Sequence, residues 1–142
     1  MTSFLERIDH DRIVAAIADA EKKTSGEIRV HLHHRPVRDP IAAGAKVFEK
    51  LGMTRTAERN GVLVFVAPRS KNFAILGDSG IHEKCGDDFW IRAAAAMGGH
   101  FQNGNFTEGI AGTIENLGNA LAAHFPRRAD DADEISNEID EG

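Results

Sequence analysis

The sequence NGVLVFVAPRSKNFAILG, residues 60–77, contains two apolar runs on either side of a short polar turn. The first run, residues 62–67, is rich in β-branched side chains and does not alternate with polar residues, which predicts a central strand covered on both faces. The second run, residues 73–76, follows at hairpin distance and ends at Gly77, which predicts an antiparallel neighbour. We take this pair of strands as the centre of the fold.

The residues before this pair predict one further strand and amphipathic helices. Residues 27–33 alternate strictly between polar and apolar side chains, as a half-buried strand does. Residues 4–23 carry apolar residues at helical spacing, in one helix or in two short ones divided near residues 9–11, and residues 41–51 form a second amphipathic pattern. The order strand, helix, strand, strand predicts a mixed sheet, in which a right-handed parallel crossover precedes the antiparallel pair.

The last third of the chain is predicted to be helical. One helix is expected to begin near Asp87, whose carboxylate suits the positive end of the helix dipole, and to end before Gly98 or at Phe101. Thr107 is a natural N-cap for a final helix, which Pro126 closes. The predicted fold is therefore an α/β sandwich, with a compact mixed sheet of three to four strands flanked by helices on both faces.

Length and charge divide the chain near residue 126. Its 142 residues fit one domain, which we expect over residues 1–126. Residues 127–142 hold two basic and seven acidic residues, which accounts for the whole formal net charge of -5, and their only large apolar side chains are Ile135 and Ile139. We therefore expect a disordered acidic tail, or a short helix that forms on a partner. Because the domain itself is electrically balanced, a nucleic-acid partner is not expected.

Composition also indicates the compartment. Cys85 is the only cysteine, which excludes an internal disulfide and a cysteine-based zinc site and favours a reducing environment. The first residues include acids where a secretory signal would carry a basic start and an apolar stretch. No segment has the roughly 20 apolar residues of a membrane helix. We expect a cytoplasmic protein without direct membrane insertion.

Three stretches of the chain resemble the TPM domain family. They are TSGEIRV at residues 24–30, RNGVLV at residues 59–64 and FAILGDSGIHEK at residues 73–84. The resemblance extends over nearly all of residues 4–126 and implies a sheet flanked by helices. It also implies functions that differ among members: acid phosphatase activity, calcium binding, and accessory roles in photosystem repair or receptor handling. Many members are exported and membrane-anchored, whereas this chain resembles a short cytosolic branch.

The segment GDSGIHE, residues 77–83, is the sharpest candidate site. Its oxygen-bearing side chains, together with two acids just beyond it, suit a hard cation such as Ca²⁺ or Mg²⁺. These candidate ligands are Asp78, Ser79, Glu83, Asp87 and Asp88. In the alternative interpretation, Asp78 forms an Asx turn, and Asp87 and Asp88 only favour the start of a helix. The spacing matches no EF-hand loop, so the metal prediction depends on the family resemblance.

Glu27 and Asn60 complete the predicted metal set. Asn60 lies at the entrance of the central strand and Glu27 opens the first strand, so Glu27 lies near the other loops only if the strand directions place it at the same edge. Exported family members often carry an acid before the Asn-Gly pair, where this chain has Arg59, which removes one candidate ligand. In the alternative interpretation, Asn60 is only a turn residue.

Histidines and the single cysteine suggest further sites, each with a simpler alternative. His31 and His33 share one face of a predicted strand and would suit a transition metal if a neighbouring carboxylate joined them, but such residues are more often solvated at a sheet edge. His82 beside Glu83 is able to act as an acid or base near neutral pH. No nucleophile motif surrounds Cys85, which favours a structural thiol.

Two functions stay open from the sequence. The first is a non-enzymatic binding or accessory module for a protein partner, stabilised by a divalent cation at the Asp78 loop. The second is a low-efficiency, cation-dependent acid phosphatase, in which the metal polarises a phosphoryl oxygen and activates water. The lack of a recognisable nucleophile and base pair favours the first function, and the family resemblance supports the second. The sequence does not decide between an enzyme and a binding protein.

Overall fold

The computed structural model describes residues 8–56, 58–127 and 139–142. Its helices and strands follow in the order α1 (His10–Glu21), β1 (Glu27–Leu32), α2 (Pro40–Lys50), β2 (Gly61–Ala67), β3 (Asn72–Gly77), α3 (Ser79–Cys85), α4 (Asp87–Gln102), α5 (Phe106–His124) and β4 (Asp140–Glu141). Two short 3₁₀ helices, Met53–Arg55 and Pro68–Ser70, follow α2 and β2. Helix α1 begins where Asp9 caps it, by accepting a hydrogen bond from Arg12 N. Residues 1–7, where the sequence predicts its start, lie outside the described residues.

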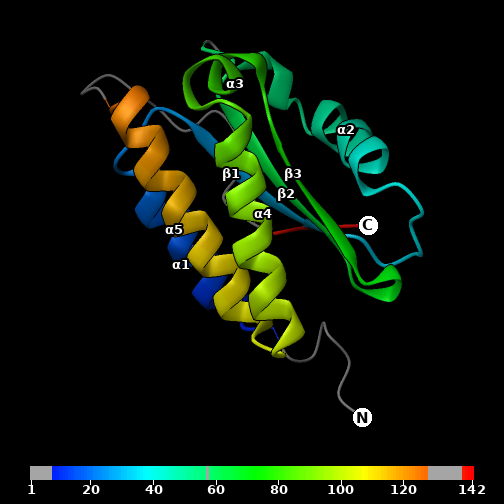
Figure 1. Cartoon of the computed structure of the whole chain (residues 1–142). Coiled ribbons are helices and arrows are strands. Elements are labelled where there is room, and N and C mark those ends of the chain that lie inside the picture. Colours follow the sequence, from blue (N-terminus) through cyan, green and yellow to red (C-terminus); the bar gives the residue numbers. More distant parts are fainter. Residues whose placement is uncertain (1–7, 57, 128–138) are drawn as a thin grey trace.

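The sheet has the predicted connectivity. Its strands lie in the order β3-β2-β1-β4. Strands β1 and β2 run parallel with Glu27 opposite Gly61, and β2 and β3 run antiparallel with Val62 opposite Gly77. Helix α2 makes the crossover between β1 and β2, and β4 adds a short parallel strand at the outer edge of β1 (Figure 1). The predicted parallel crossover and antiparallel neighbour are therefore confirmed.

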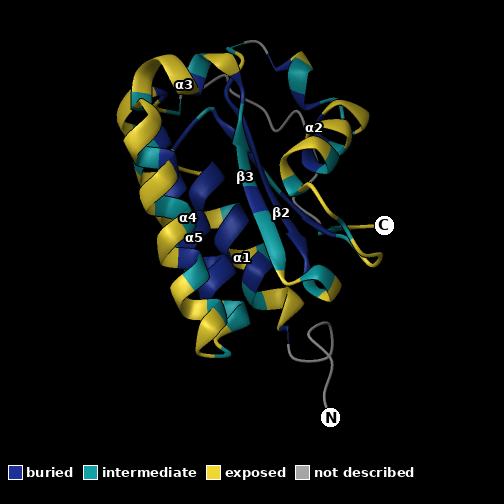
Figure 2. Ribbon diagram, turned by 45° about the vertical axis from the view of Figure 1, so that its right-hand side comes forward, coloured by how far each residue is buried: buried dark blue, intermediate teal, exposed yellow. Residues whose placement is uncertain are grey.

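Helices cover both faces of the sheet, with α1, α4 and α5 on one face and α2 on the other (Figure 1). On the side of the three helices, alternate residues of β1 and β2 join a large apolar cluster, namely Ile28, Val30, Leu32, Val62, Val64 and Val66. On the side of α2, a smaller cluster contains Phe48, Met53, Leu63, Phe65 and Ala67. Strand β2 is buried along its whole length because both of its faces are covered, which explains its unbroken apolar sequence (Figure 2). The predicted α/β sandwich is confirmed.

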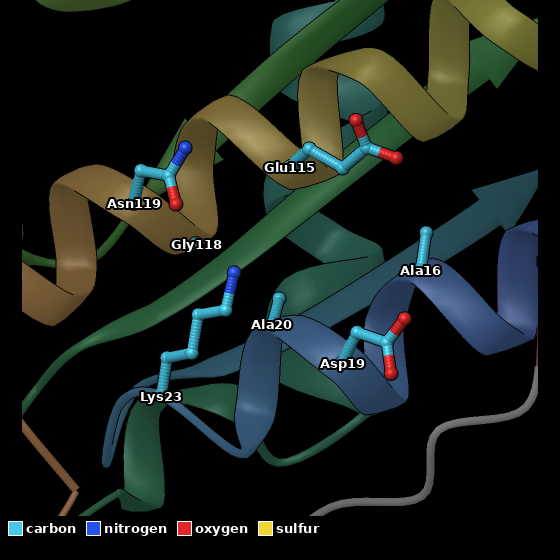
Figure 3. A pocket seen from close by; sticks show the side chains of 7 residues that line it. All are labelled: Ala16, Asp19, Ala20, Lys23, Glu115, Gly118 and Asn119. Atoms are coloured by element: carbon cyan, nitrogen blue, oxygen red, sulfur yellow. The ribbon is translucent and has the colours of Figure 1, made fainter.

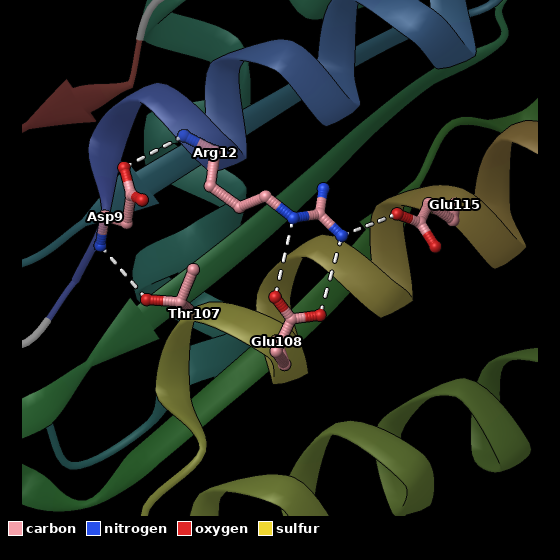
Figure 4. Close-up of polar contacts among 5 residues, drawn as sticks. All are labelled: Asp9, Arg12, Thr107, Glu108 and Glu115. Atoms are coloured by element: carbon pink, nitrogen blue, oxygen red, sulfur yellow. Dashed lines mark hydrogen bonds and ion pairs between the residues drawn. The ribbon is translucent and has the colours of Figure 1, made fainter.

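The start of α5 differs from the prediction. Asn105, and not Thr107, occupies its N-cap position. Thr107 Oγ1 instead accepts a hydrogen bond from Asp9 N at 3.0 Å, and Arg12 of α1 pairs with Glu108 and Glu115 of α5 (Figure 4). The start of α1 is therefore held to the first half of α5. Among the helices of the described residues, none combines the length and the apolar character that crossing a membrane requires.

The predicted disordered tail, residues 127–142, is only partly described. Arg127 at its start donates a hydrogen bond from Nη1 to Glu21 O at 2.9 Å. At its end, β4 pairs with β1, which differs from the disorder predicted for these last residues. Residues 128–138, which include Ile135, lie outside the described residues. The domain boundary at residue 126 stays a prediction.

Candidate functional site

The strand directions bring three predicted site residues to one rim of the sheet. Strands β1 and β2 begin at this rim and the antiparallel β3 ends there, so Glu27, Asn60 and Asp78 lie at the same end of their strands. Glu27 was included in the metal set on the condition that the strand directions place it at the same edge as the other loops, and this condition is met. This end of the sheet, which we call the Asp78 rim, lies at the amino ends of the parallel pair, whereas ligands of α/β sheets usually bind at the carboxyl ends.

Asp78 is held by hydrogen-bond donors on two sides. Arg59 donates to it twice, from Nε to Oδ2 at 2.8 Å and from Nη2 to Oδ1 at 3.0 Å. Ser79 N also donates to Oδ1 at 2.7 Å, which makes Asp78 the N-cap of α3. The Asp78 side chain is 7% exposed, while that of Arg59 is 52% exposed. The hydrogen bond to Asp78, and then the charge of that carboxylate, raise the pKa of Arg59 above its ordinary value.

The backbone around Arg59 is fixed in an unusual conformation. Arg59 has φ 52°, in the left-handed region that residues with a β-carbon rarely adopt. Its carbonyl oxygen accepts a hydrogen bond from Gly80 N at 3.0 Å. A β-carbon at Gly80 would lie 2.4 Å from Glu58 O and 2.7 Å from Arg59 O, so only glycine allows this approach. The loop before β2 therefore packs backbone to backbone on the first turn of α3.

Asn60 is a buried residue that ties neighbouring loops together. Its side-chain nitrogen Nδ2 donates to Ser25 Oγ at 3.3 Å, and Ser25 Oγ donates to Glu58 Oε2 at 3.3 Å. The backbone nitrogen of Asn60 donates to Thr56 Oγ1 at 3.1 Å. These bonds agree with its interpretation as a turn residue. Glu27 is also buried, at 2% exposed, where β1 begins.

The other predicted ligands lie on α3, which Ser79 begins, and on α4. Glu83 is exposed on α3, and Asp87 and Asp88 are exposed in the first turn of α4, where their charge suits the helix dipole. Within the part of the chain that the structure describes, no group of three or more His, Cys, Asp or Glu side chains could hold a metal ion. The Ca²⁺ or Mg²⁺ set stays a prediction, and its members Glu27, Asn60 and Asp78 share the Asp78 rim.

The aromatic and sulfur-containing side chains beside the rim are mainly packing groups. Trp90 lies over Gly77, where a β-carbon would approach Trp90 Cη2 to 2.3 Å, a contact that real β-carbons essentially never show. The ring of His82 lies 5.0 Å from the Trp90 ring, measured between centroids. Burial raises the pKa of the Cys85 thiol, which keeps it protonated at neutral pH and makes it a poor nucleophile.

A second polar cluster lies at the other end of β1. We call it the histidine edge, and it consists of residues 31–34 together with residues 139–142. His31 Nδ1 lies 2.5 Å from Asp140 Oδ2, and His31 Nε2 lies 3.1 Å from His33 Nδ1. His31 is only 3% exposed, so its interpretation as a solvated edge histidine is wrong. The joining carboxylate comes from the far end of the chain, and both ring nitrogens of His31 are already bonded, which leaves neither for a metal.

Helices α1 and α5 border a groove of about 300 Å³ (Figure 3). The helices approach closely at Gly118, where a β-carbon would lie 2.7 Å from Ala20 Cβ. Charged and amide side chains line the two sides of the groove, namely Asp19, Lys23, Glu115 and Asn119. Glu115 is engaged by Arg12 at 2.9 Å. None of the candidate site residues of the sequence analysis lines the groove.

Comparison with known proteins adds a family and a structural relative. The sequence model of the TPM domain family matches residues 1–120 of this chain. Among solved structures, the chain is similar to the NMR structure of the BA42 protein from the psychrophilic bacterium Bizionia argentinensis, with 44% identity and a TM-score of 0.87. That match covers 95% of this chain and 95% of the other. The search of curated proteins gave no match.

Proposed function

Because the chain belongs to the TPM domain family, we propose that it acts as a non-enzymatic binding or accessory module that presents the Asp78 rim to a protein partner. The pair between Arg59 and Asp78 carries this proposal. Both oxygen atoms of Asp78 accept hydrogen bonds from Arg59, and Oδ1 also caps α3. A carboxylate whose two oxygen atoms are held in this way fixes the loops of a surface and has little freedom to orient a water molecule.

Arg59 also bears on the role of a divalent cation. Its guanidinium already places positive charge at both oxygen atoms of Asp78, which are the atoms that Ca²⁺ or Mg²⁺ would use. A cation at the Asp78 rim therefore competes with Arg59. We expect weak cation binding that stiffens the loops of the rim and takes no part in a reaction.

Hydrolysis of an aryl phosphate at acidic pH tests the proposal. We expect the purified protein, with Ca²⁺ or Mg²⁺ present, to turn over no faster than its Asp78→Asn variant, since Asp78 has a structural role. Turnover that needs the metal and disappears in Asp78→Asn would instead identify a cation-dependent phosphatase. That result would overturn the proposal.

Thermal melting of the same samples reports cation binding. Ca²⁺ or Mg²⁺ should raise the Tm of Arg59→Gln more than that of the unaltered chain, because the variant frees Asp78 for the ion. A ligand at a hundredfold excess over its Kd stabilises by about 2.7 kcal/mol, so millimolar binding is measurable. Arg69→Gln is the matched control, because Arg69 is exposed at the opposite end of the sheet. Equal shifts in both variants would show that Arg59 and the cation do not compete.

A further inference from the structure

The outer edge of β1 is covered by the last residues of the chain. Asp140 lies opposite His31 and Glu141 lies opposite Leu32 in a parallel register. Gly142 continues the pairing on both sides, because its nitrogen donates to Leu32 O at 3.1 Å and its oxygen accepts from His34 N at 2.7 Å. The edge therefore binds an extended segment through the same backbone hydrogen bonds that join strands within a sheet.

Each position of this segment meets a different surface. Ile139 packs against the large apolar cluster. Asp140 bonds to the buried ring of His31, and Glu141 Oε1 lies 3.4 Å from His34 Nε2. A β-carbon at Gly142 would lie 3.3 Å from His31 Cε1, which is a tight approach. In succession, the edge therefore contacts an apolar residue, two acids and a glycine.

The surroundings of the histidine edge are basic. Arg35 and Arg38 follow β1 and are exposed, and Arg69 and Lys71 are exposed in the turn between β2 and β3. The two loops lie side by side, because Val37 N donates to Ser70 Oγ at 2.6 Å. A group of cations at the carboxyl ends of β1 and β2 attracts an acidic segment and orients it during approach.

We propose that the outer edge of β1 is a docking site for an acidic, extended segment of a protein partner, with the pattern apolar, acidic, acidic, glycine, and that residues 139–142 occupy this site in cis. Partner recognition then occurs by strand addition, in which backbone bonds provide affinity and the side-chain contacts provide selectivity. The site lies at the opposite end of β1 from the Asp78 rim and does not depend on the function proposed there.

Occupation in cis makes the site self-inhibited. A segment tethered to its own domain acts at an effective concentration of the order of millimolar, so a partner segment of equal intrinsic affinity must overcome that concentration. Weakening residues 139–142 should therefore increase the apparent affinity for a partner segment by about tenfold or more. The His31 contact should be decisive, because its ring is buried, whereas the Glu141 pair with His34 is half exposed and contributes less.

The test uses the full chain and a labelled peptide, NEIDEG, which copies residues 137–142. A triple variant of the full chain carries Ile139→Ser, Asp140→Asn and Glu141→Gln together. Fluorescence anisotropy should show at least about tenfold tighter peptide binding to this triple variant than to the unaltered chain, and the NMR signals of the His34 and Leu32 backbone should move on binding. The peptide NEINQG, in which Asn and Gln replace the acids that copy Asp140 and Glu141, should bind about tenfold more weakly. Adding His31→Gln to the triple variant should remove this difference between the peptides.

Several results would overturn the proposal. If the triple variant binds NEIDEG no better than the unaltered chain, the edge does not accept a segment in trans. If His34 N stays protected from hydrogen exchange in the triple variant, the three side chains do not hold the segment in place. If both peptides bind equally, the acids are not recognised. If the unaltered chain elutes from a size-exclusion column as a dimer, and the triple variant elutes as a monomer, the segment at the edge of β1 comes from a second copy of this chain and not from a different partner. Asp19→Asn with Glu49→Gln, two exposed acids on α1 and α2, is the control for lost negative charge.

Discussion

The two ends of β1 hold their charged groups in opposite ways. At the Asp78 rim, the guanidinium of Arg59, which stays protonated at every accessible pH, donates two hydrogen bonds to Asp78. The backbone of Arg59 is held in turn by a hydrogen bond from Gly80 N to its carbonyl oxygen. At the histidine edge, the imidazoles of His31 and His34 pair with the two carboxylates of a strand of two residues. One strand thus supports one end that is fixed by backbone contacts and an ion pair, and another end that we propose exchanges its partner.

The largest expected effect tests the rigidity of the Asp78 rim. Gly80→Ala should destabilise the protein by about 3 kcal/mol, because its β-carbon would press on two carbonyl oxygens of the backbone that cannot rotate away. Gly112→Ala on α5 is the matched control, since nothing lies within 4 Å of its β-carbon position. The control should be neutral or stabilise by up to about 1 kcal/mol through helix propensity. Urea denaturation measures both, and equal stabilities would mean that the loop before β2 moves freely on α3.

A smaller effect separates the two roles of Asp78. Asp78→Ala removes the N-cap of α3 and should cost about 1–2 kcal/mol, whereas Asp78→Asn keeps an acceptor for Ser79 N and should cost less. Asp39→Ala is the comparison, because Asp39 caps α2 through Ile41 N and Ala42 N but is exposed. Chemical denaturation should give a greater loss for Asp78→Ala than for Asp39→Ala. Equal losses would show that capping alone explains Asp78 and that its pair with Arg59 adds no stability.

The fold was predictable where local patterns and final structure agree. The unbroken apolar run of β2 and the stop at Gly77 predict their strands. The alternation of residues 27–33 locates β1, but the half-buried strand that it predicts is wrong, because Glu27 and His31 on its polar face are buried too. Helix α3 was not predicted, because it has only seven residues and places Gly80 in its first turn. Thr107 was assigned as a cap on its residue type, whereas its hydroxyl serves a contact with Asp9 from the other end of the chain.

The candidate sites show the same difference between features that local sequence patterns predict and features that depend on distant contacts. The meeting of Glu27, Asn60 and Asp78 at one rim follows from strand directions, which the sequence predicts. Arg59 was counted only as a lost ligand, whereas the fold pairs it with Asp78, 19 positions away, where it compensates the charge of that carboxylate. The histidine edge depends on a contact between His31 and Asp140, 109 positions apart, in a segment with no strand pattern.

The smallest expected effect concerns the histidine edge and the pH. Burial lowers the pKa of His33, and the nearby positive groups His31, Arg35 and His34 lower it further. The unfolded chain therefore binds a proton at His33 more readily than the folded chain does. The contribution of His33 to stability is complete above its unfolded pKa of about 6.5, and it is lost as the pH falls through the lower pKa of the folded chain. His33→Gln should flatten the loss of stability between about pH 7 and 5, as measured by urea denaturation at each pH. His100→Gln, which alters an exposed histidine of α4, should leave the slope unchanged. Because Arg59 keeps its charge throughout this range, the part of the stability loss that His33→Gln removes belongs to the histidine edge. Parallel plots of stability against pH for the variant and the unaltered chain would contradict the contrast between the two ends of β1.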